Sequence, residues 1–183
     1  MTIKIPKDRS TRTRVATVLA WAFLPAAGAA VLSAGIPQPV FLWNATPSEP
    51  VGLYVRSGAM PGPGAIIAFR APAEAFPYAD ARMGYLRRIP ILKSVAAGEG
   101  ERVCTVGGAL TINGRPRAPV QTHDVRGMRL PVWHGCRVLA TGEFFVFSDL
   151  VPNSFDSRYY GPVGQRAIVG VYRPLLIAPG GVA

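Results

Sequence analysis

Apolar positions along this chain follow two patterns, one continuous and one interrupted. Residues 15–36 carry no charged side chain and read VATVLAWAFLPAAGAAVLSAGI, and about 20 mainly apolar residues are the length of a bilayer-spanning helix. Farther along, short apolar stretches recur between Gly and Pro residues, which is typical of strands joined by turns. The expected strands are residues 52–56, 65–70, 102–106, 143–147 and 168–172.

Two other segments refine this pattern. Residues 109–112 precede Asn113-Gly114, the sharpest hairpin signal, because both central positions of a type I′ turn need a positive φ. Residues 73–88 contain Ala, Glu, Met, Leu and Arg with little β-branching, which favours a short helix or a flap between strands. We therefore expect a mainly β fold, an antiparallel sheet with a short helical insertion.

The composition agrees with a β-rich chain. It contains 20 glycines and 18 prolines, and only 16% of its residues are charged, which favours short strands and turns over long helices. Its 183 residues are close to the usual size of one compact domain, so a second catalytic domain is not expected.

The first fourteen residues are basic, and their place before the apolar run predicts the orientation of the chain. The positive-inside rule puts residues 1–14 in the cytoplasm, residues 15–36 in the membrane and residues 37–183 outside the cytoplasm, with residues 35–41 as a linker. A cleaved signal peptide is the alternative, because the small residues 27–30 suit a cleavage site. The five cations of this tail are Lys4, Lys7, Arg9, Arg12 and Arg14.

The formal charge of +10 does not by itself indicate nucleic acid, because part of it lies in this tail. Nucleic-acid binding would require the arginine-rich region after residue 40 to stay in the cytoplasm. We expect the exported arginines to balance the surface or to approach anionic lipid headgroups, so the expected partners include a lipid bilayer and no nucleic acid.

The two cysteines, Cys104 and Cys136, both lie in the exported region, where disulfides persist. We expect one bridge between them, which in the chain-entropy model contributes ~3 kcal/mol; two buried free thiols are the alternative. His123 and His134 lack the spacing of a zinc site, so no metal or cofactor is expected. Both histidines stand among Gly, Pro and Arg in expected loops, and neither is expected to be catalytic.

Lysine usage gives the first indication of chemistry. Beyond the basic tail the chain has one lysine, Lys93, and every other cation is arginine. A buried lysine can lose its proton near neutral pH, whereas arginine cannot. Residues 90–97 are mainly apolar, where desolvation favours the neutral amine, and such an amine can take the proton of a serine hydroxyl. A strand lysine with its head in water is the alternative, and spacing alone does not choose the serine.

A family resemblance suggests that serine. Residues 44–54, NATPSEPVGLY, resemble the nucleophile segment of the TraF-type conjugative-transfer signal peptidases, relatives of type I signal peptidases. Residues 91–97 with 100–103 resemble the family's lysine segment, and residues 154–162, SFDSRYYGP, its C-terminal signature. Asn113-Gly114, Gly135-Cys136 and residues 142–145 also match, so the resemblance covers about residues 40–175.

The chain departs from the family pattern at two places. It has Lys93-Ser94 where the family usually has Lys-Arg, and residues 99–101 read Glu-Gly-Glu where Pro-Gly-Asp is typical. The second departure keeps the turn glycine and an acid. The first keeps the lysine and changes the electrostatics beside it.

The resemblance implies a type I signal peptidase-like fold and a serine peptidase with a Ser/Lys dyad. Ser48 would attack the substrate carbonyl and form an acyl-enzyme, while Lys93 would accept the proton and return it to the leaving amine. The backbone N–H of Ser48 and the hydroxyl of Thr46 would stabilise the oxyanion.

Four further residues carry expectations. Ser154 would orient the Lys93 amine, and Asp156 and Arg158 would tie down the same region. For this signature the alternative is a turn stabilised by Asp and Ser side chains, with an exposed ion pair. Glu49, next to the nucleophile, is expected to be solvated.

The resemblance also implies a location and a substrate. The location is the inner membrane with a periplasmic catalytic domain, or the periplasm if the N-terminal segment is removed. The substrate is an exported, membrane-associated pilin-like precursor, which is either trimmed or cyclised head to tail. The alternatives are a general type I signal peptidase and a non-catalytic periplasmic β-domain of a pilus or secretion assembly. Oligomeric state is not indicated.

Overall fold

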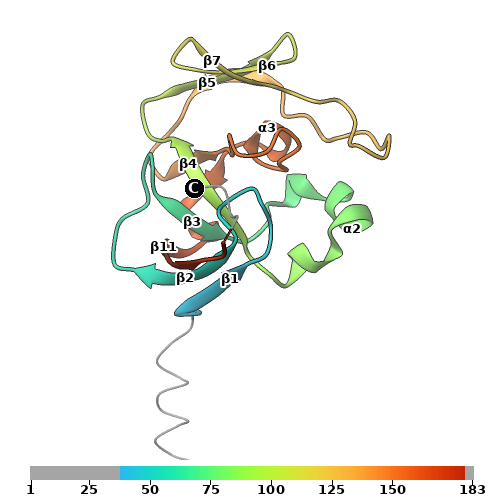
Figure 1. The fold of residues 1–183 in the computed structure, drawn as a ribbon. Coiled ribbons are helices and arrows are strands. Elements are labelled where there is room, and N and C mark those ends of the chain that lie inside the picture. The colour runs from blue at the N-terminus through green and yellow to red at the C-terminus, as the bar shows by residue number, and fades with distance from the viewer. Residues whose placement is uncertain (1–37, 180–183) are drawn as a thin grey trace, which may run out of the picture. The chain divides into compact units, whose positions relative to one another are not determined.

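The computed structural model describes residues 38–179, and most of its regular structure is β-strand (Figure 1). A compact unit begins at Val40. The expected membrane segment, residues 15–36, lies outside the described residues. Within residues 38–179 no helix is long and apolar enough to cross a bilayer.

Seven strands form the larger sheet, and every pairing between its neighbours is antiparallel. β4, which carries the only lysine of the described region, lies inside this sheet between β3 and β9. In spatial order the strands are β1 (Phe41–Asn44), β2 (Gly52–Ser57), β11 (Ile168–Ile177), β3 (Ile66–Phe69), β4 (Ile91–Ala97), β9 (Glu143–Val146) and β10 (Val163–Gly164).

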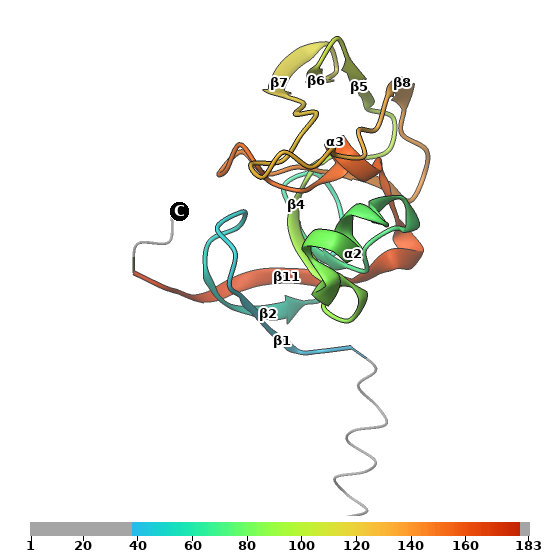
Figure 2. The same cartoon turned by 90° about the vertical axis from the view of Figure 1, so that its right-hand side faces the viewer.

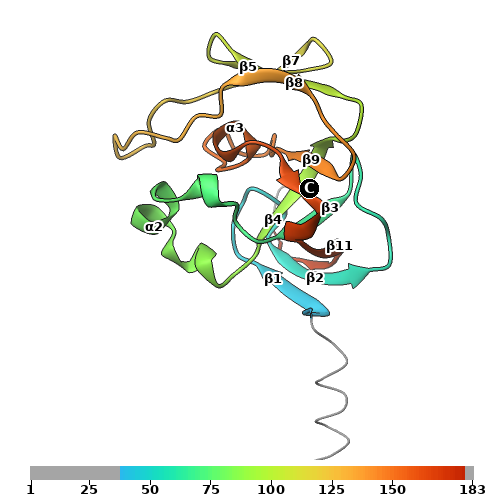
Figure 3. The same cartoon turned by 180° about the vertical axis from the view of Figure 1, so that it is seen from behind.

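A second, four-stranded antiparallel sheet is formed by the segment of the chain between β4 and β9 of the larger sheet. Figures 1, 2 and 3 show it at one end of the unit, beyond the short helix α3 (Ser157–Tyr160). Its strands in spatial order are β7 (Arg115–Pro119), β6 (Ala109–Ile112), β5 (Arg102–Val106) and β8 (Gly135–Val138).

One hydrophobic core joins the two sheets and α3. Val103 and Leu110 of the smaller sheet belong to the same buried cluster as Phe145 of β9 and Tyr160 of α3. A second, smaller cluster that includes Leu92 packs the other face of the larger sheet. Because both faces of β4 are covered, its burial does not alternate strictly along the strand, unlike that of β5, where every second residue is exposed or half-buried.

The five expected strands are confirmed, with ends that differ by a few residues. The hairpin is also confirmed: Asn113 and Gly114 have φ angles of 51° and 75° and join β6 to β7. Residues 73–88 form three short helical pieces, η1 (Ala73–Ala75), α2 (Tyr78–Arg82) and η2 (Gly84–Arg87), rather than one helix. The expected linker extends one residue too far, because Phe41 is the first residue of β1.

The expected disulfide is present between Cys104 and Cys136, whose Cα atoms are 4.0 Å apart. The two residues are direct register partners on β5 and β8. Cys104 is half-buried and Cys136 is exposed, so the alternative of two buried free thiols is wrong.

Candidate active site

The loop between β1 and β2 contains Ser48, and one asparagine organises it. Asn44, buried at the end of β1, donates from its side-chain amide to the carbonyl oxygens of Thr46 (2.9 Å), Glu49 (2.9 Å) and Pro50 (3.1 Å). Its Oδ1 accepts from the backbone N–H of Thr46 (3.2 Å) and from the Thr46 hydroxyl (3.0 Å). Five contacts from one side chain therefore define the path of the loop.

Ser48 is buried, with 7% of its surface exposed. Its Oγ lies 3.3 Å from the Thr46 Oγ1, and its carbonyl oxygen accepts a hydrogen bond from the Ser148 hydroxyl (2.5 Å). Because the Thr46 hydroxyl donates to Asn44, the Ser48 hydroxyl is the donor in the contact between Ser48 and Thr46. Thr46 must therefore turn its O–H before it can donate to an oxyanion.

Lys93 lies in the middle of β4, opposite Ile67 of β3, and only 4% of its surface is exposed. It shares a face of the strand with Ile91 and Val95 of the main core, because side chains two residues apart point the same way. Burial lowers the pKa of Lys93 to about 8, and the charge of Arg158 acts in the same direction, against the opposing charges of Asp156 and Glu49. The alternative of a lysine with its head in water is therefore wrong.

One cavity of about 690 Å³ is lined by Thr46, Ser48, Lys93 and Ser154. These residues come from the β1–β2 loop, from β4 and from the segment before α3. Most of the remaining lining residues are apolar, among them Leu42, Trp43, Leu86, Ile89, Val151 and Phe155. The cavity thus combines three Ser and Thr hydroxyls, a buried amine and apolar walls, the mixture of a few polar groups and an apolar lining that is typical of ligand pockets.

Asp156 and Arg158 form a fully buried ion pair. Nε and Nη2 of Arg158 donate to the two carboxylate oxygens of Asp156 at 2.8 and 2.9 Å. Asp156 also caps α3 through the Arg158 backbone N–H, and Arg158 donates to the carbonyl oxygens of Ser154 and Pro119, both at 3.0 Å. The two side chains are 0% and 1% exposed, so the alternative of an exposed ion pair is wrong.

Ser154 is buried in the cavity wall, with 3% of its surface exposed. Its hydroxyl has no hydrogen-bond partner among residues 38–179. The expected hydrogen bond to the Lys93 amine is therefore not formed in this arrangement, although both side chains line the same cavity.

The expectation that Glu49 is solvated is wrong. Glu49 is 4% exposed, and its Oε1 and Oε2 accept hydrogen bonds from the Ser94 backbone N–H (2.6 Å) and hydroxyl (3.1 Å). Burial raises the pKa of Glu49, while the Ser94 hydrogen bonds and the charge of Lys93 act in the opposite direction. The serine that stands where the family usually has arginine thus binds the residue that follows Ser48.

The second departure, residues 99–101, retains a tight turn. Gly100 has a φ of 80°, a conformation open to glycine at little cost. Glu101 closes the turn by accepting from the Gly98 N–H (2.8 Å) and also accepts from the Asn113 amide (3.0 Å).

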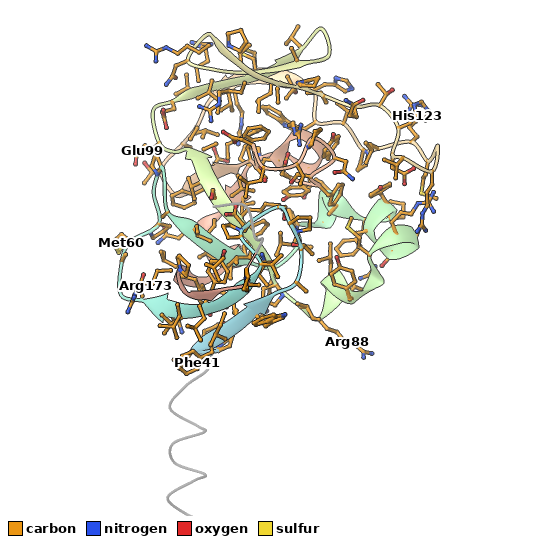
Figure 4. The ribbon with its side chains drawn as sticks, in the orientation of Figure 1. Phe41, Met60, Arg88, Glu99, His123 and Arg173 are labelled. Atoms are coloured by element: carbon orange, nitrogen blue, oxygen red, sulfur yellow. A yellow bond between two sulfur atoms is a disulfide. The ribbon has the colours of Figure 1, made fainter. Side chains whose placement is uncertain are left out.

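The two histidines are exposed and stay outside the cavity that Ser48 and Lys93 line. His123 contributes to a separate cavity of about 560 Å³ beside the Arg82–Asp124 ion pair, and Figure 4 shows it at the edge of the unit. Within residues 38–179, therefore, no histidine lines the cavity with Ser48.

Sequence reasoning did not assign a role to three residues of this site, Asn44, Ser94 and Ser148. Asn44 stands inside the nucleophile segment, and an asparagine, whose side chain can accept from the backbone N–H two residues on, is a detectable local signal for a turn. The partnership of Glu49 with Ser94 spans 45 positions, and that of Ser148 with Ser48 spans 100, so no local pattern reveals either one.

Comparisons with known proteins agree with the resemblance. Residues 14–176 match the model of the family described as "Signal peptidase, peptidase S26". The plasmid transfer protein TraF of Escherichia coli is 34% identical over 144 residues, 73% of this chain and 81% of that protein. The conjugal transfer protein TraF of Agrobacterium tumefaciens (strain 15955) is 35% identical over 166 residues, 84% of this chain and 89% of that protein.

Among solved structures, a signal peptidase I from Enterococcus faecalis V583 aligns with 63% of this chain and 98% of its own. The alignment has 23% sequence identity and a TM-score of 0.38.

Proposed function

Because the chain belongs to the signal peptidase family, peptidase S26, and is related to TraF conjugal transfer proteins, we propose that it is a serine endopeptidase with Ser48 as nucleophile and Lys93 as general base. The observation that carries the proposal is the cavity lined by both Ser48 and a buried lysine whose pKa is lowered to about 8. Near that pH a useful fraction of the amine is neutral and can accept a proton.

In the proposed reaction, the Ser48 oxygen attacks the scissile carbonyl while its proton moves to the Lys93 amine. The tetrahedral intermediate then collapses, the C–N bond breaks, and Lys93 returns the proton to the leaving amine. The acyl group stays esterified to Ser48 until a second nucleophile, water or an amine of the substrate, attacks the ester. Lys93 serves as base again in that step.

The oxyanion is proposed to receive hydrogen bonds from the Ser48 backbone N–H and, after rotation, from the Thr46 hydroxyl. The proximity of the two hydroxyl oxygens, 3.3 Å, supports this assignment. Ser154 is proposed to contact the protonated amine of Lys93 during the reaction, since its buried hydroxyl has no other partner among residues 38–179. Asp156 and Arg158 hold the backbone of this segment in place through their ion pair and carbonyl contacts.

The proposed substrate is an exported, membrane-associated pilin-like precursor with small residues near the cut. Two observations support it: the relatives are named for plasmid and conjugal transfer, and the cavity walls are mainly apolar. Cyclisation follows if a substrate amine resolves the acyl-enzyme, and trimming follows if water does. The proposed location is the inner membrane with a periplasmic peptidase domain, supported by the basic tail and the apolar run of residues 15–36.

The test is incubation of the full chain with a candidate pilin precursor, followed by mass measurement of the product. Ser48→Ala and Lys93→Arg should abolish processing, because the first removes the nucleophile and the second installs a side chain that stays protonated. A trimmed product lighter by one water indicates cyclisation. His123→Ala is the matched control and should process normally.

Processing that persists in Ser48→Ala would disprove the proposal and favour a non-catalytic exported β-domain. Broad cleavage of unrelated Ala-x-Ala precursors by the wild type would instead favour a general type I signal peptidase.

A further inference from the structure

A carboxylate connects the two segments that carry the dyad. Glu49 directly follows Ser48, and Ser94 directly follows Lys93. The Glu49 carboxylate accepts hydrogen bonds from the Ser94 N–H at 2.6 Å and from the Ser94 hydroxyl at 3.1 Å. The nucleophile loop and β4 are thus joined one residue away from both reacting groups.

The backbone of β4 explains why the Ser94 N–H is available to this carboxylate. The Ser94 carbonyl oxygen accepts from the Phe147 N–H at 3.1 Å, on the side of the strand that faces β9. In an antiparallel pair, the N–H of the same residue points to the same side. β9 ends at Val146, and Glu49 takes the place that a strand carbonyl would otherwise occupy.

The glutamate side chain is itself fixed within the structure. Only 4% of Glu49 is exposed, and its backbone carbonyl oxygen accepts from the Asn44 amide at 2.9 Å. Both carboxylate oxygens act as acceptors for donors of Ser94, which suits the ionised form.

The charges around this carboxylate come from several elements. Glu49 faces Lys93 of β4, which lowers its pKa, and Asp149, which raises it. Burial and, after it, the charge of Glu49 raise the pKa of Tyr54 on β2. Lys93 in turn faces Glu49, Asp156 and Arg158. Arg158 is already paired with Asp156, so Glu49 is the acid near Lys93 that has no arginine partner of its own among the described residues.

We propose that Glu49 is a positioning residue of this site: its carboxylate holds the Ser48 loop against the strand that carries Lys93 and keeps a negative charge near the amine. The inference rests on the proposed function. It assigns two separable effects to one side chain. The length of the side chain allows the hydrogen bonds to Ser94, and its charge raises the pKa of Lys93.

Two substitutions separate the effect of side-chain length from the effect of side-chain charge. Glu49→Gln keeps the length and removes the charge, whereas Glu49→Asp keeps the charge and shortens the side chain by one methylene. The measurement is kcat/KM of the full chain against pH, from 6 to 10, on a precursor that the wild type cleaves.

The two variants should differ in the part of the profile that they change. A neighbouring negative charge favours the protonated amine, so removing it lowers the pKa of Lys93. In Glu49→Gln the acidic limb of the profile should therefore move to lower pH by about one unit. In Glu49→Asp the limb should stay in place, while the alkaline plateau should fall about tenfold because the loop is no longer held. Ser94→Ala, which keeps the charge and the backbone hydrogen bond, should lower the plateau by a smaller factor and leave the limb unchanged.

Glu99→Gln is the matched control, since it removes one negative charge from an exposed position that Figure 4 shows at the periphery. Its profile should coincide with that of the wild type. If Glu49→Gln leaves the limb unmoved and Glu49→Asp leaves the plateau intact, the positioning role is disproved.

Ser48→Ala, assayed in parallel, separates this result from a failure of the proposed function. An inactive Ser48→Ala beside wild-type-like Glu49 variants overturns only the inference, whereas an active Ser48→Ala overturns the dyad. Should Glu49→Gln fail to fold, Glu49→Asp and Ser94→Ala still test the role through the plateau.

Discussion

The seven-stranded sheet and the four-stranded sheet differ in one cation: the larger sheet carries a buried lysine besides its exposed Arg56 and Arg173, whereas every cation of the smaller sheet is exposed. In the larger sheet, Lys93 is almost fully buried, and the Asp156–Arg158 pair that acts on it is buried completely. In the smaller sheet, β5 and β6 turn apolar side chains such as Val103 and Leu110 to the core, and the cations of β5, β7 and β8 are exposed. These cations are Arg102, Arg115, Arg117 and Arg137.

The difference agrees with the proposed role of Lys93 as a general base. A buried charge costs several kcal/mol unless it is paired and hydrogen-bonded, and an exposed cation costs little. The larger sheet therefore carries an energetic cost at Lys93 that a merely structural sheet would not need. The smaller sheet, with a disulfide and a one-sided core, is expected to contribute stability without contributing reacting groups.

The largest expected effect is at the buried ion pair. Arg158→Met leaves the Asp156 carboxylate uncompensated in the core and removes the hydrogen bonds to the carbonyl oxygens of Ser154 and Pro119. Breaking one partner of a buried pair destabilises by about 3–5 kcal/mol. The measurement is urea-induced unfolding at pH 7.

The matched control lies in the smaller sheet. Arg117→Met removes an exposed pair with Asp149, whose N–O distance is 3.2 Å, and exposed pairs contribute less than about 1 kcal/mol. Equal losses of unfolding free energy in Arg117→Met and Arg158→Met would remove the distinction between the two sheets.

The disulfide gives the next largest effect. Cys104→Ser with Cys136→Ser opens a link across 32 positions and should lower the free energy of unfolding by about 3 to 4 kcal/mol, as the chain-entropy model gives for loops of this length. Because the bridge lies in the smaller sheet, kcat below the unfolding temperature should not change. A loss of activity in the folded double variant would show that this sheet takes part in the site.

Strands of both sheets could be predicted: the expected ranges 52–56, 65–70, 143–147 and 168–172 are strands of the larger sheet, and residues 102–106 are β5 of the smaller one. The smaller sheet has one covered face, so the alternation of β5 and the Asn113-Gly114 turn are visible in the sequence. β4 is covered on both faces and its burial does not alternate strictly, so the sequence pattern does not single it out as a strand. Residues 73–88 broke into three short pieces because Pro77 and Gly84 interrupt any longer helix.

The candidate dyad could be singled out from the sequence, but the burial of the charged residue beside it could not. Lys93 could be singled out as the only lysine beyond the basic tail, and the serine by resemblance, but their roles remain predictions. Glu49 was misjudged, because its partner Ser94 reaches it only through the packing of the β1–β2 loop on β4. Burial of charged groups is a tertiary property, and a charged residue beside a proline has the same local pattern whether it is buried or solvated.

The smallest expected effect tests the cost of the buried lysine directly. Lys93 has a pKa of about 8 in the folded chain against an ordinary value of 10.5, so the unfolded chain binds the proton more tightly. Below pH 8 the folded state bears the full cost, and as pH rises from 8 to 10.5 that cost disappears. In urea-induced unfolding at pH 7, the free energy of unfolding of Lys93→Met should therefore exceed that of the wild type by about 3 kcal/mol. At pH 10 the difference should be much smaller. The gain should come with complete loss of processing, because Met cannot accept a proton.

Arg102→Met, at an exposed position of the smaller sheet, should show no such pH-dependent difference. If the gain in unfolding free energy of Lys93→Met over the wild type is smaller at pH 7 than at pH 10, the charged amine is paired in the folded state and its burial carries no cost. The buried cation of the larger sheet would then be no more costly than the exposed cations of the smaller one.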